Sequence, residues 1–362
     1  MKKIRVLHFE LSENLGGIET FLSNLMSQID RDSFQFEFVT SATHPALEDK
    51  IIEMGGIIHR FPTVKQIIQY NKVLRTLLSD DYNIIHVHKN SAANIIPVIE
   101  AKKMGKKVIV HSHNTSPSVG RVTSLLHYMN KNKLNELADY KLACSTDAGK
   151  WLYTDNNFTI MTNGIITERF KFDQVKRKKI RNELSINENQ IVYGNIGRFS
   201  EQKNHKRLIE IFKEIRKEQN NSILLLVGDG DLRSEIEATV RKYSLEANVI
   251  FAGVRNDIPD LLMAMDAFIM PSLYEGLPIV AIEAQASGLQ LFLSDTISKE
   301  TDIIGHTTWF SLNENNETIV NKICNTKYDN ERVLFNDNVV SAGYDIKKTA
   351  DMISEVYRSL CQ

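Results

Sequence analysis

The sequence predicts an α/β fold in which two parallel-sheet domains follow one another along the chain. Its 362 residues suffice for two domains of about 100 to 200 residues each. Short apolar runs alternate with longer amphipathic runs, which is typical of β-α-β units. The alternation breaks once, at the turn dipeptide Asn163-Gly164 and the charged stretch Lys171–Arg181, and then restarts. We therefore predict one domain at residues 1–165, a second at residues 166–345 and a terminal segment at residues 346–362.

The first domain contains short apolar runs that are rich in Ile, Val and Phe, and these predict strands. The expected strands are Ile4–Phe9, Phe34–Thr40, Gly56–Phe61, Ile84–His88, Lys107–His111, Tyr140–Ser145 and Thr159–Thr162. Between the first two, Phe21, Leu22 and Leu25 follow the i, i+3, i+4 spacing of a helix. The expected helices are Glu19–Gln28, Lys65–Ser79 and Leu125–Leu137.

The second domain repeats this pattern without repeating the sequence. The expected strands are Ile191–Gly197, Ser222–Val227, Val249–Ala252, Ala267–Met270, Leu291–Ser294 and Thr308–Ser311. The expected helices are Lys206–Glu218, Asp231–Tyr243, Ile258–Met265 and Val280–Ala286. The last segment, Lys347–Leu360, has apolar residues at helical spacing and is expected to form a terminal helix.

Composition and charge are those of an ordinary globular protein. Hydrophobic residues make up 42%, charged residues make up 25%, and the net charge of -1 gives no overall field that favours nucleic acid. The three cysteines show neither metal nor disulfide spacing, which predicts a reducing cytoplasm. The start of the chain, Met1–Arg5, leads into a strand and lacks the apolar stretch of a signal peptide. We therefore expect a cytoplasmic protein with no nucleic-acid partner.

Positive charge is concentrated in the first domain. The segment from Lys89 to Lys150 contains ten basic and four acidic residues. Such a segment favours contact with an anionic ligand or an anionic membrane, and peripheral contact with the inner face of the cell membrane is one expectation. A solvated basic face explains the same composition equally well.

Two loops that follow expected strands contain residues suited to phosphate, and parallel sheets bind ligands at the carboxyl ends of their strands. Gly16 and Gly17 precede a helix, where backbone N–H groups approach an oxyanion, although a tight turn explains them equally well. They do not form the G-x-G-x-x-G pattern of dinucleotide-binding proteins. In the loop Gly197–Asn204, Arg198 and Lys203 are spaced to bracket a diphosphate, and a pair of solvated charges is the alternative.

The loop Pro271–Pro278 precedes a helix whose start is a further candidate anion site, since Pro278 suits a first-turn position. Glu275 lies in this loop, and Glu283 lies about one and a half turns into the helix. Carboxylates accept hydrogen bonds from ribose and sugar hydroxyls. Glu283 stands among alanine and isoleucine residues, and a charge in such company is unusual without a partner.

Histidines end two of the expected strands. His111 and His113 lie two residues apart and therefore share one face of a strand, and His86 and His88 repeat this spacing. Neither pair has an obvious third ligand, so we expect no metal site. We expect His113 to bind sugar or act in catalysis, with a hydrogen-bonded structural histidine as the alternative. The loop Gly253–Asp257 follows another strand, and its backbone is suited to flank a flat base.

The segment Phe251–Leu289 and the loop Gly197–Asn204 resemble the donor-binding half of the retaining glycosyltransferase family four, and Glu275 and Glu283 have its E-x7-E spacing. The resemblance covers nearly the whole chain, and the piece Ile297–Glu300 is most similar to the bacterial exopolysaccharide and capsule branch. It implies the GT-B fold: an acceptor-binding and a donor-binding Rossmann-like domain face each other across a cleft, and the last helix crosses back to the first domain.

The resemblance also implies a reaction and a role for each candidate residue. A sugar would pass from a nucleotide diphosphate donor, with uridine as the favoured base, to a glycan or lipid-linked saccharide, with retention and without a metal or other cofactor. Arg198 and Lys203 would neutralise the leaving diphosphate. The other implied contacts are Gly16 and Gly17 with phosphate or sugar, Glu275 and His113 with the sugar, Glu283 with ribose, Val254 and Arg255 with the base, and Gly276, Leu277 and Pro278 with the donor.

Three other classes of function are alternatives to this one. A catalytically silent sugar-nucleotide-binding subunit is the main alternative, although both cations and both glutamates are retained. An epimerase or phosphorylase of the same fold requires other acid residues, or a pyridoxal phosphate lysine and a much longer chain. A nicotinamide dehydrogenase requires the glycine fingerprint that the first loop lacks.

Overall fold

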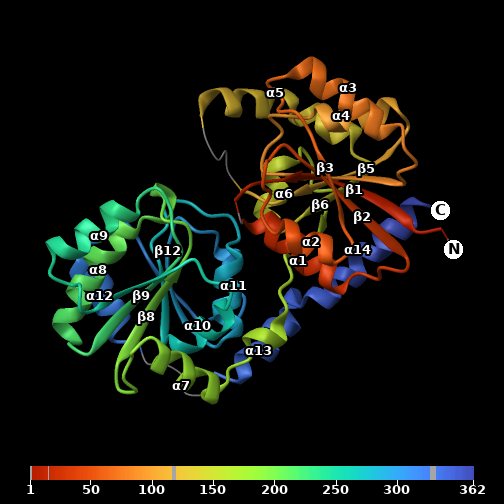
Figure 1. The fold of residues 1–362 in the computed structure, drawn as a ribbon. Coiled ribbons are helices and arrows are strands. Elements are labelled where there is room, and N and C mark those ends of the chain that lie inside the picture. The colour runs from red at the N-terminus through yellow and green to blue at the C-terminus, as the bar shows by residue number, and fades with distance from the viewer. Residues whose placement is uncertain (1, 15, 116–119, 327–331) are drawn as a thin grey trace. The chain divides into compact units, whose positions relative to one another are not determined.

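The computed structural model describes residues 2–14, 16–115, 120–326 and 332–362, which form two units, each around its own parallel sheet (Figure 1). Unit 1 comprises Met1–Ile165 and Gly343–Gln362, and unit 2 comprises Ile166–Ala342. The predicted α/β class with two parallel sheets is therefore confirmed. Among the described helices, none has the length and apolar character needed to cross a bilayer.

The described sheet of unit 1 is parallel and has the strand order β3-β2-β1-β4-β5-β6-β7. Its strands are β1 (Ile4–Leu11), β2 (Phe34–Thr40), β3 (Ile57–Arg60), β4 (Ile84–Lys89), β5 (Lys107–Ser112), β6 (Tyr140–Ala143) and β7 (Thr159–Ile160). The strand order reverses between β1 and β4. The loops that follow these two strands therefore diverge at the point where open α/β sheets bind ligands.

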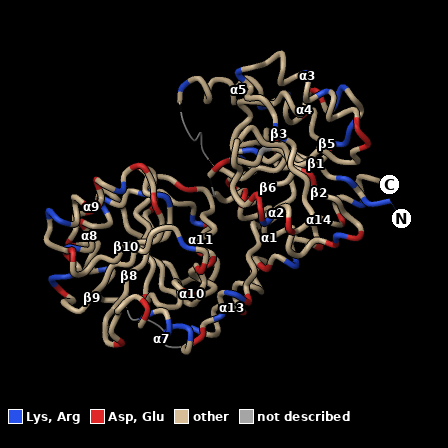
Figure 2. Tube along the Cα trace, viewed as in Figure 1, with Lys and Arg blue, Asp and Glu red and all other residues tan. Residues whose placement is uncertain are grey.

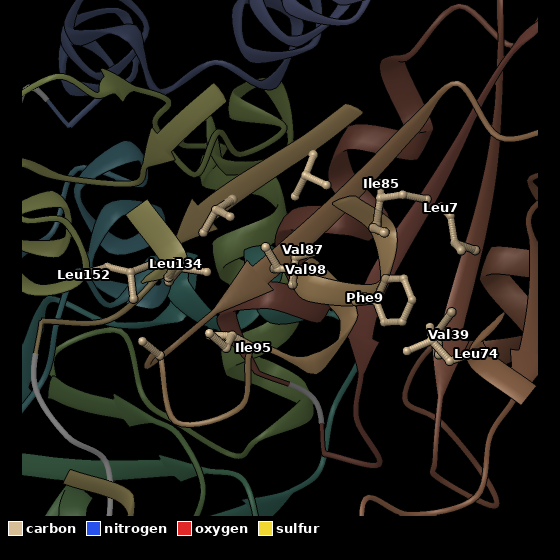
Figure 3. Close-up of a cluster of buried hydrophobic side chains, with 14 of the residues drawn as sticks. Leu7, Phe9, Val39, Leu74, Ile85, Val87, Ile95, Val98, Leu134 and Leu152 are labelled. Carbon is tan, nitrogen blue, oxygen red and sulfur yellow. The ribbon is translucent and has the colours of Figure 1, made fainter. Parts of the chain in front are cut away.

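Alternation along the strands gives the two faces of this sheet different chemistry. Leu7, Phe9 and Ile85 point into an apolar core beneath the helices of one face (Figure 3). Those helices are α3 (Ile67–Leu78), α4 (Ile96–Lys103), α5 (Arg121–Leu137) and α6 (Thr146–Leu152). The opposite face carries histidines from β1, β4 and β5 and packs against α1 (Gly17–Gln28) and α14 (Ile346–Leu360). These two helices contact each other, and α2 (Glu48–Glu53) lies beside α1.

The described sheet of unit 2 is also parallel and has the strand order β10-β9-β8-β11-β12-β13, so its reversal lies between β8 and β11. Its strands are β8 (Ile191–Ile196), β9 (Ser222–Val227), β10 (Val249–Gly253), β11 (Ala267–Met270), β12 (Gln290–Ser294) and β13 (Thr307–Phe310). Its α-helices are α7 (Gln174–Glu183), α8 (His205–Glu218), α9 (Arg233–Lys242), α10 (Ile258–Ala264), α11 (Ile279–Ala286), α12 (Asn316–Cys324) and α13 (Leu334–Val339). Helices α8, α9 and α12 cover one face (Figure 1).

Every strand expected from the sequence is present among the described residues, within two residues at each end. The expected helices are present as well, but the sequence prediction missed shorter ones such as α4 and α6. Helix α4 buries Pro97, Val98, Glu100 and Ala101 and has no single apolar stripe for a periodicity argument to detect. Tertiary burial, rather than local pattern, fixes such helices.

The terminal helix α14 belongs to unit 1, which confirms the expected return of the chain to the first domain. Ile165 N–H donates to the Tyr344 carbonyl at 2.8 Å, and Ile346 N–H donates to the Ile165 carbonyl at 2.9 Å. A Cβ on Gly164 would lie 2.8 Å from Ile346 Cα, so this close approach requires glycine. The turn dipeptide seen in the sequence is therefore also a docking point for the terminal helix.

Most of the charged stretch Lys171–Arg181 forms α7 inside unit 2 (Figure 2). Asp173 caps this helix by accepting from the N–H groups of Val175 and Lys176. Arg181 is fully buried and donates from Nε to the Ala264 carbonyl at 2.9 Å. Its positive charge therefore stabilises the carbonyl end of α10.

Glycines allow the loops after β8 and β9 to touch. Gly228 has φ +132°, and a Cβ there would lie 2.2 Å from the Gly197 carbonyl oxygen. A Cβ on Gly230 would lie 2.5 Å from the Phe199 carbonyl oxygen. Gly197 N–H donates to the Val227 carbonyl, and Phe199 N–H donates to the Asp229 carbonyl, both at 2.9 Å. The loop that contains Arg198 is thus held by backbone contacts.

Gly228→Ala should destabilise unit 2 more than Gly253→Ala. Both glycines have positive φ, a region that costs other residues about 1–2 kcal/mol, but only Gly228 faces a backbone clash. We expect Gly228→Ala to lose at least about 1 kcal/mol more free energy of unfolding than Gly253→Ala, measured by urea titration. Equal losses in the two variants would contradict the close approach of these loops.

Candidate functional site

The loops that follow β8 and β11 meet at the reversal of the strand order in unit 2. Leu273 N–H donates to the Gln202 carbonyl at 2.8 Å, and Gln202 Nε2 donates to the Tyr274 carbonyl at 3.0 Å. Asn204, which has a left-handed φ of 53°, donates from Nδ2 to the Pro271 carbonyl at 3.1 Å. Local sequence pattern does not indicate these contacts, which bring two of the predicted site loops together.

Lys203 and Glu275 form an ion pair at this junction. Lys203 Nζ lies 2.6 Å from Glu275 Oε1, and the two side chains are only 16% and 11% exposed. The lysine stem passes over Gly197, where a Cβ would lie 3.1 Å from Lys203 Cε. The cation and the carboxylate predicted from separate motifs therefore occupy one place, shielded from much of the solvent.

Arg198 lies near the start of the same loop and forms an exposed ion pair. Its Nη2 lies 2.9 Å from Asp231 Oδ2, with the side chains 51% and 82% exposed. Exposed ion pairs of this kind contribute about 0–1 kcal/mol, so an anionic ligand can displace Asp231 at low cost. The loop thus carries one sheltered cation and one that is about half exposed.

The helix start predicted to bind an anion is present, with Pro278 just before the first turn rather than in it. Pro278 is the N-cap residue, with φ −69°, and α11 begins at Ile279. Leu277 is buried at 7% exposure, whereas Gly276 is only partly buried. The N–H groups of the first helical turn therefore follow directly after the loop that contains Glu275.

Glu283 on α11 has the abnormal environment that its sequence neighbours indicated. Burial raises the pKa of Glu283 to about 7, and the positive charge of Arg169 opposes this increase only in part. Arg169 lies in the 3-10 helix η1 (Thr167–Phe170), and the sequence did not identify it as a partner. A carboxyl group that is close to half protonated at neutral pH is poised to respond to hydroxyl donors.

Val254 and Arg255, the two residues predicted to flank a base, differ in their exposure and in their bonding partners. Val254 is 76% exposed. Arg255 is engaged by carboxylates, with Nε 2.7 Å from Asp257 Oδ1 and Nη2 2.9 Å from Glu183 Oε1, and these bonds raise its pKa. Asp257 also lines an open pocket of about 550 Å³ together with Arg169, Lys176, Asn256, Pro259 and Asp260. Arg255 therefore links this loop to Glu183 of α7.

The glycine loop of unit 1 is organised by Glu19. Gly16 N–H donates to Glu19 Oε2 at 3.1 Å, and Ser12 donates from Oγ to Glu19 Oε1 at 2.6 Å. The Gly16 N–H group therefore already has a carboxylate partner inside the protein. Helix α1 begins at Gly17, so the N–H groups of its first turn are what this loop presents to an anion.

His113 lies at the end of β5 in a chain of imidazoles. Its Nε2 lies 2.9 Å from His88 Nδ1, and His88 Nε2 lies 3.0 Å from His8 Nδ1. Burial lowers the pKa of His113 to about 3, with the Asn163 side chain opposing the shift, so the ring is neutral at physiological pH.

The expectation that neither histidine pair has a third ligand is wrong. His8, His86 and His88 form one cluster, and His88, His111 and His113 form another. Strand register explains the clusters, because His8 pairs with His86 across β1 and β4, and His88 pairs with His111 across β4 and β5. The even spacing of these histidines along predicted strands was the available signal, but it locates a third ligand only once the strand neighbours are known.

Comparison with known families matches both halves of the chain. The profile described as Glycosyltransferase Family 4 matches residues 15–169, and the profile described as Glycosyl transferases group 1 matches residues 176–333. The second match spans Arg198, Lys203, Glu275 and Glu283. The first spans the glycine loop and His113.

Relatives match along nearly the whole chain. EpsF of Bacillus subtilis, named as a glycosyltransferase, is 30% identical over 376 residues, covering 98% of this chain and 96% of EpsF. The UDP-Gal:alpha-D-GlcNAc-diphosphoundecaprenol alpha-1,3-galactosyltransferase of Escherichia coli is 24% identical, covering 98% and 97%. Among solved structures, HepE of Anabaena in complex with UDP and glucose has a TM-score of 0.80 at 20% identity, covering 98% and 100%. These likenesses confirm the predicted fold.

Replacing Glu283 by glutamine should stabilise the protein in alkaline solution. The pKa of Glu283 is near 4.5 in the unfolded state and about 7 in the folded state, so the folded protein retains this proton to a higher pH. The contribution of Glu283 to the free energy of unfolding therefore falls as the pH rises between these two values. Glu283→Gln should therefore unfold at higher urea concentration than the wild type at pH 8, by up to about 3 kcal/mol. The difference should vanish near pH 4.

The control for this comparison is Glu235→Gln, on an exposed position of α9. This variant should follow the wild type at every pH. A difference between Glu283→Gln and the wild type that did not change with pH would contradict the raised pKa.

Proposed function

This chain belongs to glycosyltransferase family 4, and from that premise we propose that it transfers a sugar from a nucleotide diphosphate sugar to a saccharide acceptor. Uridine diphosphate is the proposed carrier, and a glycan or lipid-linked saccharide of surface polysaccharide biosynthesis is the proposed acceptor. The name of the Escherichia coli relative, with a UDP-sugar donor and a diphosphoundecaprenol-linked acceptor, supports both choices.

The observation that carries this proposal is the junction of the β8 and β11 loops. Lys203 is held at 2.6 Å from Glu275, and Arg198 lies on the same loop beside an exposed carboxylate. The outgoing group in sugar transfer is a diphosphate whose negative charge grows as the glycosidic bond breaks. Cations and a helix start that lie close to the departing diphosphate stabilise that growing charge.

We assign the chemistry as follows. The bond between the anomeric carbon and the diphosphate oxygen breaks first, and the sugar gains oxocarbenium character. The acceptor hydroxyl oxygen bonds to the same face of the anomeric carbon, which retains its configuration. The acceptor proton passes to the leaving phosphate oxygen, so no protein nucleophile takes part. Because Arg198, Lys203 and the start of α11 supply the positive charge, we propose that the reaction needs no metal ion.

The remaining residues are assigned to different parts of the donor. Glu275 accepts from donor sugar hydroxyls, and Glu283 accepts from ribose hydroxyls. Gly276, Leu277 and Pro278 lead into the helix start that faces phosphate, and Val254 lies beside the base. Gly16, Gly17 and His113 of unit 1 are assigned to the phosphate and sugar end, with the contact from the glycine loop made through the first turn of α1 because Gly16 N–H is bonded to Glu19.

The main alternative is a subunit that binds the nucleotide sugar without transferring it. Such a subunit has no need of a sheltered lysine–glutamate pair at the diphosphate, which is why we favour the enzyme. A screen of nucleotide sugars that monitors release of the nucleotide diphosphate separates the two. The enzyme should release it slowly without acceptor by donor hydrolysis, and a silent subunit should release none.

Contact with an anionic membrane is proposed for α5, within the basic segment Lys89–Lys150. Val122, Leu125 and Met129 lie on one face of this helix at i, i+3 and i+7 and are 71%, 61% and 68% exposed. The exposed cations Arg121 and Lys133 lie on the same helix. An exposed apolar stripe with flanking basic residues is typical of helices that lie in a membrane interface.

Arg198→Ala and Lys203→Ala should each lower turnover by at least ~100-fold, since each removes one stabiliser of developing charge. Lys206→Ala, at an exposed position in α8, is the matched control and should keep its activity. The measurement is release of the nucleotide diphosphate with acceptor present, and addition of EDTA should not lower the rate. A decrease below tenfold in both variants, with the fold intact, would argue against the assignment.

The membrane contact is tested by co-sedimentation with anionic liposomes at low salt. The double variant Leu125→Ser, Met129→Ser should lose most of the bound fraction, because it removes the exposed apolar stripe of α5. Val175→Ser, which replaces a 77% exposed side chain in unit 2, should bind like the wild type. The idea should be abandoned if the wild type stays in the supernatant.

A further inference from the structure

Five histidines share the face of the unit 1 sheet that packs against α1 and α14: His8, His86, His88, His111 and His113. Among the described residues, His8 Nε2, His86 Nε2 and both ring nitrogens of His111 are buried without a protein hydrogen-bond partner. Buried polar atoms of this kind are rare in proteins and call for an explanation. Their concentration in one cluster distinguishes this place from the rest of the core.

We propose that His88, His111 and His113 bind one transition-metal ion of the zinc class. One nitrogen from each residue lies within 4.8 Å of the others. Zinc–nitrogen bonds of about 2.0–2.1 Å place tetrahedral ligands roughly 3.3 Å apart, so small side-chain movements suffice. A site that offers only imidazoles suits zinc, cobalt, nickel or copper rather than magnesium or calcium.

The hydrogen-bond chain already supplies the outer support that such a site needs. His88 Nδ1 lies 2.9 Å from His113 Nε2, so the ion takes the place of this hydrogen bond. His88 Nε2 then donates to His8 Nδ1, 3.0 Å away. Metal-bound histidines characteristically donate their second ring N–H to a fixed acceptor, which orients the ring.

The neighbouring cluster of His8, His86 and His88 is the poorer candidate. All three rings are buried, and His86 Nδ1 is engaged by the Tyr357 hydroxyl at 2.7 Å. His113, by contrast, is only partly buried at the end of β5, so the proposed site is the more accessible of the two clusters. Phe21 of α1 packs edge-on to His111 with centroids 5.4 Å apart, which restrains that ring.

This inference goes beyond the proposed transfer reaction, which needs no metal. One consequence rests on the proposed function: an ion bound to His113 competes with the donor sugar for that side chain. Metal binding itself is measured without donor or acceptor. A protein that binds no metal could still transfer a sugar, and a protein that transfers no sugar could still bind the metal.

The test is calorimetric titration of EDTA-treated, dialysed protein with Zn²⁺, supported by the visible spectrum of the Co²⁺ form. We expect one tight ion per chain and the absorption of tetrahedral Co²⁺. His113→Ala and His111→Asn should abolish this site, and His8→Asn should weaken it by roughly 10–100-fold. His44→Ala, at an exposed position of unit 1 outside the cluster, should bind like the wild type.

Thermal unfolding establishes whether each variant is folded. If the buried His111→Asn variant does not fold, the zinc affinity of His113→Ala alone tests the proposal. The proposal is overturned if the wild type binds no zinc, or if His113→Ala binds it as tightly as the wild type does. Loss of binding in His86→Asn with retention in His113→Ala would also overturn it, because the ion would then occupy the neighbouring cluster.

Discussion

The ion pair between Lys203 and Glu275 is the interaction on which the candidate site depends. It forms only because the loops after β8 and β11 meet at the strand reversal, where hydrogen bonds from Gln202 and Asn204 join them. The lysine stem in turn needs the open backbone of Gly197, and Gly197 contacts Gly228. A sheltered cation at the carboxyl end of a parallel sheet is thus the product of backbone geometry in three loops.

Arg198 and Lys203 are each paired with a carboxylate, and the exposure of each pair decides how easily a ligand can replace that carboxylate. Arg198 and Asp231 are largely exposed, so their separation costs little. Lys203 and Glu275 are sheltered, so a diphosphate that takes the lysine must leave Glu275 with donors of its own, such as sugar hydroxyls. Burial gives Glu283 a raised pKa instead of a strong partner. One unit therefore holds two glutamates in different electrostatic states, which suits two different contacts with a donor.

The sequence predicted the strands of both sheets and the loops that carry Arg198, Lys203, Glu275 and Glu283, because these depend on local pattern and on the rule that ligands bind at strand ends. It did not predict which loops touch. The engagement of Arg255 by Glu183, the support of Gly16 by Glu19 and the role of α7 all involve partners or burial that local pattern does not show. The histidine cluster was missed for the same reason, since strand register brings His8 to His86 and His88 to His111.

The most direct test of the central claim is a crystal structure of the protein with uridine diphosphate bound. Diphosphate oxygens should lie within hydrogen-bonding distance of Lys203 Nζ and the Arg198 guanidinium, near the start of α11, with the ribose hydroxyls on Glu283. A nucleotide bound elsewhere, with Arg198 still on Asp231 and Lys203 out of reach of phosphate, would contradict it.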